Sequence, residues 1–342
     1  MPTSSASRAA TFDETGPTET SPAQAVSRLP VSGWGIAASA SWLGVTAVSL
    51  ARDDVGDWSR TATFAYGAAV VALAAFVVSL AGARLGQAGT WFAHRTPWLI
   101  VLGLGLALWE LVTAKLGWLP LPFFPPPQAL LEVYLDDFGK LGASVLASVK
   151  LQISGYAIGA VIGFLTGVSI GWSRSAGYWV HPVLRFIGPL PATAWLPVAF
   201  FLFPSSWSAS IFLIALATAF PVTVLTWSGV ASVPSSYYDV ARTLGATPWF
   251  LIRKVAVPAA MPHMFVGLFM GLGASFAVLV VAEMMGVKAG LGWYLQWAQG
   301  WAAYANMYAA LIVMSLLCSG AITLLFKVRD RLLSWQKGVV KW

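Results

Sequence analysis

Hydrophobic residues run along this chain in long blocks separated by short polar segments. A block of ~20 mostly apolar residues is long enough to cross the ~30 Å hydrocarbon core of a bilayer as a helix. Eight blocks meet this length, at about 32–51, 62–83, 97–118, 148–172, 179–203, 208–231, 263–285 and 305–327. The pattern therefore predicts an all-α, polytopic transmembrane bundle of about eight spans.

The composition is typical of a membrane protein and argues against a soluble globular domain and a nucleic-acid-binding protein. Charged residues make up 10% of the 342 residues and hydrophobic residues 58%, which is unusual for a soluble globular domain. The formal net charge is +7, but the basic residues stand singly beside apolar blocks and form no stripe that could bind nucleic acid. We expect contact with membrane lipid and no nucleic-acid partner.

The basic residues also predict which side of the membrane each loop faces. Lys and Arg collect in cytoplasmic loops, and here they occupy alternate connections and the C-terminal segment, whereas the intervening loops are acidic or nearly uncharged. The residues are Arg84, Arg95, Arg174, Arg185, Arg242, Arg253, Lys254, Lys327, Arg329, Arg331, Lys337 and Lys341. The alternation predicts a multi-pass protein of the cell (inner) membrane with both termini in the cytoplasm.

Four parts can be distinguished along the chain. Residues 1–30 are rich in Ser, Thr, Ala and Pro and are expected to be a disordered tail, because they cannot bury enough apolar surface to fold alone. Residues 31–90 contain the first two spans, an accessory transmembrane hairpin without a recognisable motif. Residues 91–330 contain the other six spans, and residues 331–342 form a basic cytoplasmic tail.

A polar and basic island, Ser235–Pro262, lies between two apolar blocks. Ser236 and Asp239 have the S-x-x-D spacing of a capping box, which predicts that a helix begins there. Gly245 is expected to end this helix in the left-handed conformation.

A second short helix is predicted in the same loop. Thr247 is expected to be its N-cap and Pro248 its first residue, whereas Pro258 and Pro262 are expected to end it. Two short helices on either side of a glycine hinge make a rigid knob that suits a groove on another protein.

The spacing within Ser235–Pro262 resembles the EAA loop, E-A-A-x3-G-x9-I-x-L-P, which is the coupling element of permeases from binding-protein-dependent ABC importers. We will therefore call Ser235–Pro262 the coupling loop. The matching residues are Asp239, Ala241, Gly245 and Val255-Ala256-Val257-Pro258. Asp239 replaces the motif's Glu and Val240 its first Ala. In that family the loop docks on the cytoplasmic ATPase. The resemblance therefore implies ATPase coupling for Asp239, Ala241, Arg242, Gly245 and Pro258.

This resemblance covers residues from about 97 to 327. The proline-rich stretch Leu119–Pro127, followed by a short amphipathic helix, is similar to the outer segment of nitrate, sulfonate and taurine-type permeases. The family implies a homodimer, two copies of a separate ATP-binding subunit and an extracytoplasmic solute-binding protein. It also implies that the chain is not an enzyme and forms the path for a small solute, an anion such as nitrate, sulfonate, taurine or bicarbonate.

Glycines at helical spacing predict close helix packing in two spans. The fourth span carries Gly at every fourth position, and the seventh carries a shorter series; small residues at this spacing let membrane helices approach each other closely. The residues are Gly155, Gly159, Gly163, Gly167 and Gly171 in the fourth span, and Gly267, Gly271 and Gly273 in the seventh.

The fifth span is rich in proline, which removes backbone donors and bends or interrupts a helix. Its run Ile187–Pro197 is similar to the family's I-P-P-x-A-x-x-P segment. An interrupted segment indicates a transport route, because freed carbonyls are tolerated only inside protein or beside a watery cavity. Pro191 and Pro197 are therefore candidates for the translocation pathway, and a merely kinked helix is the alternative.

Glu283 lies in the A-E-M part of a pattern similar to the family's A-E-M…G-L-G, which continues as Gly290-Leu291-Gly292. An acid within a span is costly and is a candidate for function. Counted along a helix from Pro262, Glu283 lies near the outer surface of the membrane, where Lys288 could form an ion pair with it. Glu283 is therefore a candidate for either of two roles, a structural ion pair or a part of the translocation pathway.

Other chemistry is not indicated by the sequence. The chain has no G-x4-G-K-[ST] phosphate loop, and its three histidines, His94, His181 and His263, have no metal-ligand spacing, so no cofactor is expected. The single cysteine, Cys318, excludes an internal disulfide. Two alternatives are a secondary transporter, for which Glu110 is the one acid near a span centre, and a structural scaffold without an ATPase partner.

Overall fold

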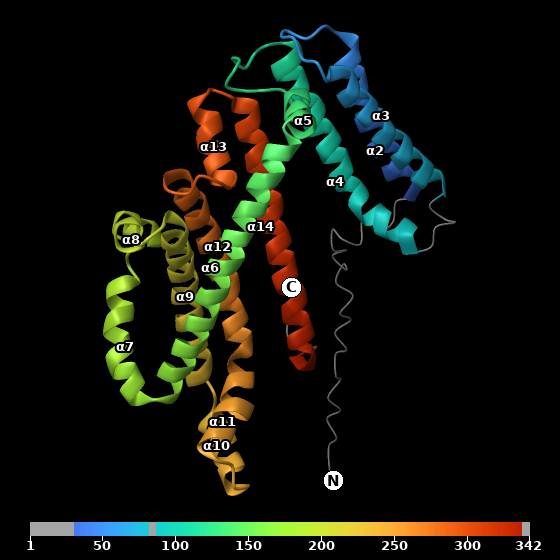
Figure 1. Ribbon diagram of the computed structural model, residues 1–342. Helices are drawn as coiled ribbons and strands as arrows, with labels where there is room; N and C mark the ends of the chain where they lie inside the picture. Colours follow the sequence, from blue (N-terminus) through green and yellow to red (C-terminus); the bar gives the residue numbers. More distant parts are fainter. Residues whose placement is uncertain (1–30, 82–86, 337–342) are drawn as a thin grey trace, which may run out of the picture. The chain divides into compact units, whose positions relative to one another are not determined.

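The computed structural model describes residues 31–81 and 87–336, and every regular element in these two ranges is a helix (Figure 1). The expected tail at 1–30, Arg84 and residues 337–342 of the basic tail lie outside the described residues. The chain forms two compact units, Met1–Trp118 and Leu119–Trp342.

The number of membrane-crossing helices agrees with the sequence pattern. The described residues contain seven helices that are long and apolar enough to cross a membrane, and eight crossings if a bent pair forms one span. The bent pair is Arg174–Ile187 with Ala192–Leu202, and its two arms meet at 88°. The prediction of an all-α bundle of about eight spans is confirmed.

The first unit contains α2 (Val31–Ala51), α3 (Thr61–Ala81), α4 (Gln87–Glu110) and a π-turn, η2 (Leu111–Lys115). Helix α2 packs against both α3 and α4. Its apolar contacts involve buried Trp42 and Val45 on α2 and Ala68 and Ala72 on α3. The third apolar block thus packs on the N-terminal hairpin.

Buried charges connect one end of α2 with the end of α4. The Lys115 ammonium lies 2.7 Å from a carboxylate oxygen of Asp54 and donates to the carbonyls of Ser49 and Arg52 at 2.7 and 2.6 Å. Glu110 is fully buried and accepts a 2.6 Å hydrogen bond from the Ser49 hydroxyl. These contacts assign Glu110 to the packing of the first unit.

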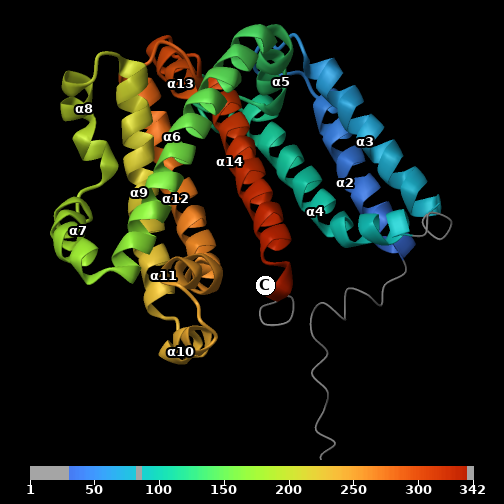
Figure 2. The same ribbon diagram turned by 60° about the horizontal axis from the view of Figure 1, so that its bottom comes forward.

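The second unit is built around α9 (Ser206–Ala231), which packs against α6 (Phe138–Trp172) and α12 (Val257–Met285). These three helices lie side by side in both ribbon views (Figures 1 and 2). The remaining elements are α5 (Pro127–Asp136), α7 (Arg174–Ile187), η3 (Ala192–Trp195), α8 (Leu196–Leu202), α10 (Ser235–Thr243), α11 (Pro248–Leu251), η4 (Ile252–Ala256), α13 (Leu291–Gly300), α14 (Tyr304–Leu332) and η5 (Ser334–Gln336). The short helix expected after the proline-rich stretch is α5.

Glycines on α6 account for its contact with α9. A Cβ atom at Gly155 would lie 2.5 Å from the Ile214 side chain, and one at Gly163 would lie 2.7 Å from the Ala219 carbonyl. The contacts advance along both helices together, and Gly171, at the far end of the series, lies equally close to Val230. The two helices therefore run in the same direction with their backbones close together, as the four-residue spacing predicts.

The glycines of α12 only partly follow the prediction. Gly267 approaches the Pro221 carbonyl and Gly271 the Thr218 carbonyl, both on α9. Gly273 has no such neighbour, because a Cβ atom there would meet open space. Its expected packing role is wrong, since two residues beyond Gly271 the helix presents a different face.

Candidate coupling loop and translocation segment

The coupling loop lies at the ends of α9 and α12 and projects beyond them (Figure 2). Helix α10 ends at Thr243, and Gly245 has a left-handed φ of +81°. The Thr247 hydroxyl accepts a 3.4 Å hydrogen bond from the Phe250 amide, and Pro248 is the first helical residue of α11. The predicted glycine hinge and the second helix start are confirmed.

The predicted capping box is wrong. Helix α10 begins at Ser235 with Pro234 as its N-cap, and no side chain caps it. Ser236 is therefore already inside the helix, where its hydroxyl cannot serve as an N-cap. Asp239 instead accepts a 3.1 Å hydrogen bond from Arg242, one helical turn further along.

The expected stop at Pro258 and Pro262 is also wrong. Helix α11 continues through η4 into α12, and Pro248–Met285 forms one membrane-length helical run. Within η4 the amide of Val257 bonds to the carbonyl of Ile252, five residues back instead of four. This π-turn places Pro258 in the first turn of α12, where a missing N–H is tolerated. The second half of the loop is thus continuous with a long apolar helix.

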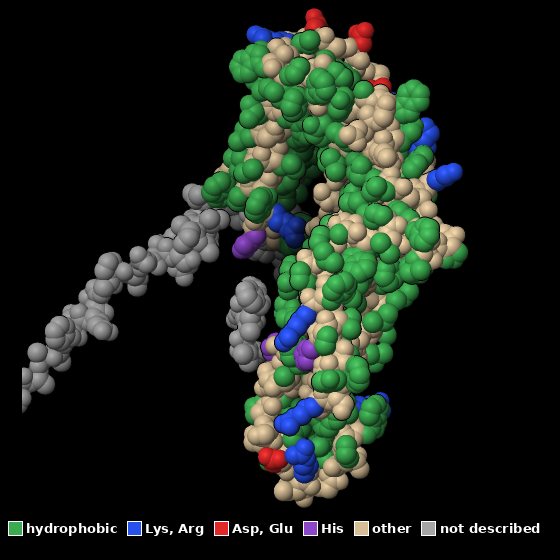
Figure 3. All heavy atoms as spheres, turned by 90° about the vertical axis from the view of Figure 1, so that its left-hand side faces the viewer, with side chains coloured by type: hydrophobic (Ala, Val, Ile, Leu, Met, Phe, Trp, Pro, Cys, Tyr) green, Lys and Arg blue, Asp and Glu red, His purple; other side chains and the backbone are tan. Residues whose placement is uncertain are grey.

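An apolar patch covers the outward side of the loop. No residue of α10 is buried, and the side chains of Leu244 and Trp249 are 83% and 68% exposed. The other exposed members of this patch are Tyr237, Val240 and Phe250. Basic side chains lie around this end of the unit in the space-filling view (Figure 3). An exposed apolar patch with a charged rim indicates a protein-binding surface. The sequence analysis predicted such a surface here but did not identify the apolar residues that form it.

On its opposite side the loop is anchored by Tyr238. The Tyr238 ring contacts that of Trp172, the last residue of α6, with centroids 5.8 Å apart. Tyr238 also packs on a buried cluster of Val230, Ala256 and Ala260, from the end of α9 and the start of the α11–α12 run. Burial raises the pKa of its hydroxyl. This residue, which the sequence analysis did not single out, thus connects the loop with three long helices.

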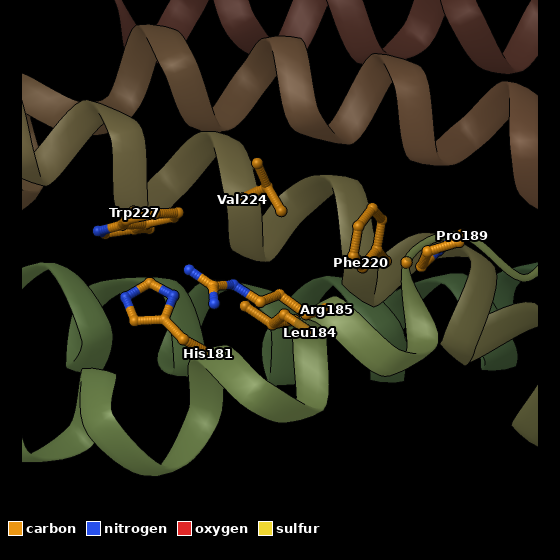
Figure 4. Close-up of a pocket in the computed structure, with 8 residues that line it drawn as sticks. His181, Leu184, Arg185, Pro189, Phe220, Val224 and Trp227 are labelled. Carbon is orange, nitrogen blue, oxygen red and sulfur yellow. The ribbon is translucent and has the colours of Figure 1, made fainter.

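The fifth apolar block is interrupted, not merely kinked. Helix α7 ends at Ile187, and Pro191 is the N-cap of the one-turn helix η3. Pro197 then lies in the first turn of α8. A cavity of about 690 Å³ lies beside the break, between α7 and α9 (Figure 4).

Glu283 is fully buried, and its partners come from two other helices. Its carboxylate accepts hydrogen bonds from the Ser148 hydroxyl of α6 at 2.7 and 2.9 Å and from the Gly292 amide of α13 at 2.8 Å. The Ser148 hydroxyl also accepts a 2.8 Å bond from the Leu291 amide. The carboxylate therefore caps the positive N-terminal end of α13. The expected ion pair with Lys288 is wrong, because Lys288 is exposed and Glu283 is bonded elsewhere.

Glycine at position 290 makes this arrangement possible. Its φ of +116° is a left-handed value, and a Cβ atom there would collide with the Glu283 carboxylate.

The predicted site residues fall into two groups. The coupling residues lie together on one loop, whereas Pro191, Pro197 and Glu283 lie on other elements. Within residues 31–81 and 87–336, no group of three or more His, Cys, Asp or Glu could hold a metal ion.

A protein family described as "Binding-protein-dependent transport system inner membrane component" matches residues 159–335, more than half of the chain. The match includes the whole coupling loop, the interrupted segment and Glu283. A probable ABC transporter permease protein of Brucella abortus is 32% identical over 241 residues, which are 70% of this chain and 95% of that protein.

Two further relatives carry names that state a substrate. The nitrate import permease protein NrtB of Synechococcus elongatus is 28% identical over 70% of this chain and 87% of its own length. The bicarbonate transport system permease protein CmpB of the same species is 31% identical over 61% of this chain and 73% of its own length. The family match excludes the secondary transporter and the scaffold, and the chain belongs to the multi-pass inner-membrane permeases of binding-protein-dependent ABC importers.

Proposed function

We propose that the coupling loop is the surface on which the ATP-hydrolysing subunit of the importer docks. Permeases of this family work with a separate ATPase and a solute-binding protein. The observation that carries the proposal is the two-sided construction of the loop. Its outward side exposes Leu244, Trp249 and Phe250, while Tyr238 anchors its inward side on α6, α9 and the α11–α12 run.

Each residue assigned to coupling has a physical role in this proposal. Asp239 and Arg242 form an exposed ion pair that orients the basic side chain towards the partner. Ala241, half-buried on the same helix, leaves room for close approach of the docked subunit. Gly245 allows the sharp turn, and Pro258 lies just after the π-turn that joins the loop to α12.

The resulting mechanism is a rigid-body one. A helix that enters the membrane without a break moves as a unit, so a push on α11 displaces α12. Two copies of the chain, related by a two-fold axis, are expected to hold two ATPase subunits, and closure of the ATPases on ATP brings the two coupling loops together. In this arrangement both termini and the loop lie in the cytoplasm, and the binding protein docks on the opposite face.

The solute path lies beside the interrupted segment around Pro191 and Pro197, where backbone groups freed from helix pairing can face water. The names of the nitrate and bicarbonate relatives support a small oxyanion as the substrate. The contacts of Glu283 support the structural role over the pathway role. The accessory hairpin, 31–90, is expected to stabilise the permease core, 91–330, from its periphery.

Substitution of Gly245 tests the coupling role. Gly245→Val places a β-branched residue at a left-handed φ, which is strongly disfavoured. We expect loss of ATPase co-purification and of solute uptake, with normal amounts of permease in the membrane. Gly320→Ala is the matched control, since a Cβ atom there meets nothing within 4 Å. Normal uptake by Gly245→Val would overturn the proposal.

A further inference from the structure

An unpaired cation lies in the cavity beside the interrupted segment. Arg185, on α7, is the charged residue among those that line this cavity of about 690 Å³. In Figure 4 its guanidinium extends from α7 towards α9, between His181 and Val224. No acidic side chain among the described residues forms an ion pair with it. Arg185 is eleven residues beyond Arg174, roughly 16 Å along the helix axis.

The Arg185 side chain is exposed and therefore accessible to an anion that enters the cavity. The cavity wall is largely apolar, with Leu184 on α7 and Phe220 and Val224 on α9. Arginine does not lose its proton in proteins, and a charge within a membrane segment is rare unless it pairs or serves a function. An anion that enters this cavity is attracted to the guanidinium by its permanent charge.

We propose that this cavity is an oxyanion-binding site in which Arg185 supplies the charge and holds the transported anion next to the break in the fifth span. The inference rests on the proposed function, in which a small oxyanion is the solute. It adds a specific site within the permease to that function.

The shape of the site fits a planar anion of this class. Nitrate and bicarbonate are both planar monoanions in which three oxygens surround one central atom. A guanidinium can donate two parallel hydrogen bonds to two oxygens of such a group. The imidazole of His181 lies beside the guanidinium and is held by the Trp227 ring, with ring centroids 4.4 Å apart. Its nitrogens provide a further polar contact for the third oxygen.

The break in the helix is part of the site. Gly188 and Pro189, directly after α7, line the cavity. A Cβ atom at Gly188 would lie 2.6 Å from the Phe220 ring, so glycine permits the close approach of this backbone to α9. Irregular backbone within a membrane segment is tolerated where it lines a cavity that can hold water or a solute. The charge and the break thus occur at the same place.

Charge restoration tests the role of Arg185 in transport. The chain has one cysteine, so Arg185→Cys combined with Cys318→Ser leaves a single thiol in the cavity. In proteoliposomes that contain the complete importer, we expect uptake of labelled nitrate or bicarbonate to fall on the order of tenfold, as for the loss of one charge-assisted hydrogen bond. Reaction with 2-aminoethyl methanethiosulfonate restores a cation and should restore uptake, whereas the anionic sulfonatoethyl reagent should not.

Two controls separate this inference from the proposed function. Arg174→Cys, on the same helix but outside the cavity lining, should lose little uptake. The Arg185→Cys importer should retain ATPase co-purification and ATP hydrolysis stimulated by the binding protein, because the coupling loop is intact. If assembly is intact but uptake is indifferent to the charge at position 185, the anion site is refuted and the coupling proposal survives. If the wild-type chain binds no ATPase, the proposed function itself fails.

The same cavity could attract the phosphate of a lipid headgroup, and a protection experiment distinguishes the two oxyanions. Val224→Cys with Cys318→Ser keeps Arg185 and places a thiol on the opposite wall. In phosphatidylcholine vesicles, nitrate or bicarbonate should slow the labelling of this thiol relative to chloride at equal ionic strength, and Arg185→Gln should abolish that protection. Protection by phosphatidylglycerol alone, without any effect of nitrate or bicarbonate, would overturn the assignment to the transported anion.

Discussion

The phenol ring of Tyr238 meets the indole of Trp172 nearly edge-on, with centroids 5.8 Å apart and an angle of 71° between the ring planes. Tyr238 belongs to the exposed coupling loop, whereas Trp172 is the last residue of a 35-residue membrane helix. An aromatic pair of this kind contributes about 1 kcal/mol beyond the area that it buries. The contact thus connects a proposed docking surface with the bundle that must move.

Removal of this contact should uncouple ATP hydrolysis from transport. Tyr238→Ala is expected to lower the number of solute molecules taken up per ATP hydrolysed at least threefold, while the ATPase still co-purifies. The ratio is measured in proteoliposomes with labelled solute and a phosphate-release assay. Tyr238→Phe keeps the ring and should retain most of the coupling. Equal ratios for Tyr238→Ala and the wild type would refute the role of this contact.

The exposed apolar patch should contribute most of the affinity for the ATPase. Leu244→Asp places a charge where an 83% exposed leucine is expected to be buried by the partner. We expect the dissociation constant of the permease–ATPase complex to rise about tenfold or more, since central apolar residues dominate such interfaces. Binding can be measured by interferometry with detergent-solubilised permease. Leu332→Asp, at the exposed end of α14, should leave the affinity unchanged.

Reversal of the charge at position 239 should weaken docking more than it weakens the fold. The Asp239–Arg242 pair is exposed, and pairs of this kind contribute about 0–1 kcal/mol to stability. Asp239→Arg should therefore leave the melting temperature nearly unchanged while ATPase co-purification falls, and Asp239→Glu should behave like the wild type. Similar docking by both variants would show that the acid at this position does not orient the interface.

The contact between α6 and α9 should tolerate no side chain at the central glycines. Gly163→Val introduces atoms where the Ala219 carbonyl already lies 2.7 Å from an ideal Cβ position. Overpacking of this kind costs about 1–3 kcal/mol or more, so the melting temperature in detergent should fall by several degrees or the protein should not accumulate. Gly142→Ala, also on α6 but in open space, is the control. An unchanged melting temperature would contradict the close approach of the two helices.

The buried carboxylate of Glu283 should behave as a structural cap. Glu283→Ala leaves the Ser148 hydroxyl and the Gly292 amide without their buried acceptor, at a cost of about 1–3 kcal/mol for each unsatisfied group. We expect a lower melting temperature and a loss of uptake that follows the loss of folded protein. If uptake per folded molecule falls at an unchanged melting temperature, Glu283 acts in the pathway instead.

Several features could be predicted from the sequence because they depend on neighbours along the chain. Span lengths follow from runs of apolar residues that must match the bilayer thickness. The hinge at Gly245 and the helix start at Thr247-Pro248 follow from local backbone preferences. The glycine face of α6 follows from helical periodicity alone, which fixes what one face presents but not which helix it meets.

The tertiary structure decided the features in which distant segments meet. The cap of Glu283 needed Ser148, 135 residues away, and the anchor of Tyr238 needed the ends of three long helices. The helix continues from α11 through Pro258 into α12 because a π-turn precedes this proline. The usual helix-ending role of proline does not predict this continuation. The surroundings of Arg185 arose in the same way, because residues of α7 and α9 line one cavity only after the interrupted segment turns back on the bundle. Such contacts follow from packing in three dimensions, and the spacing of residues along one chain carries no direct record of them.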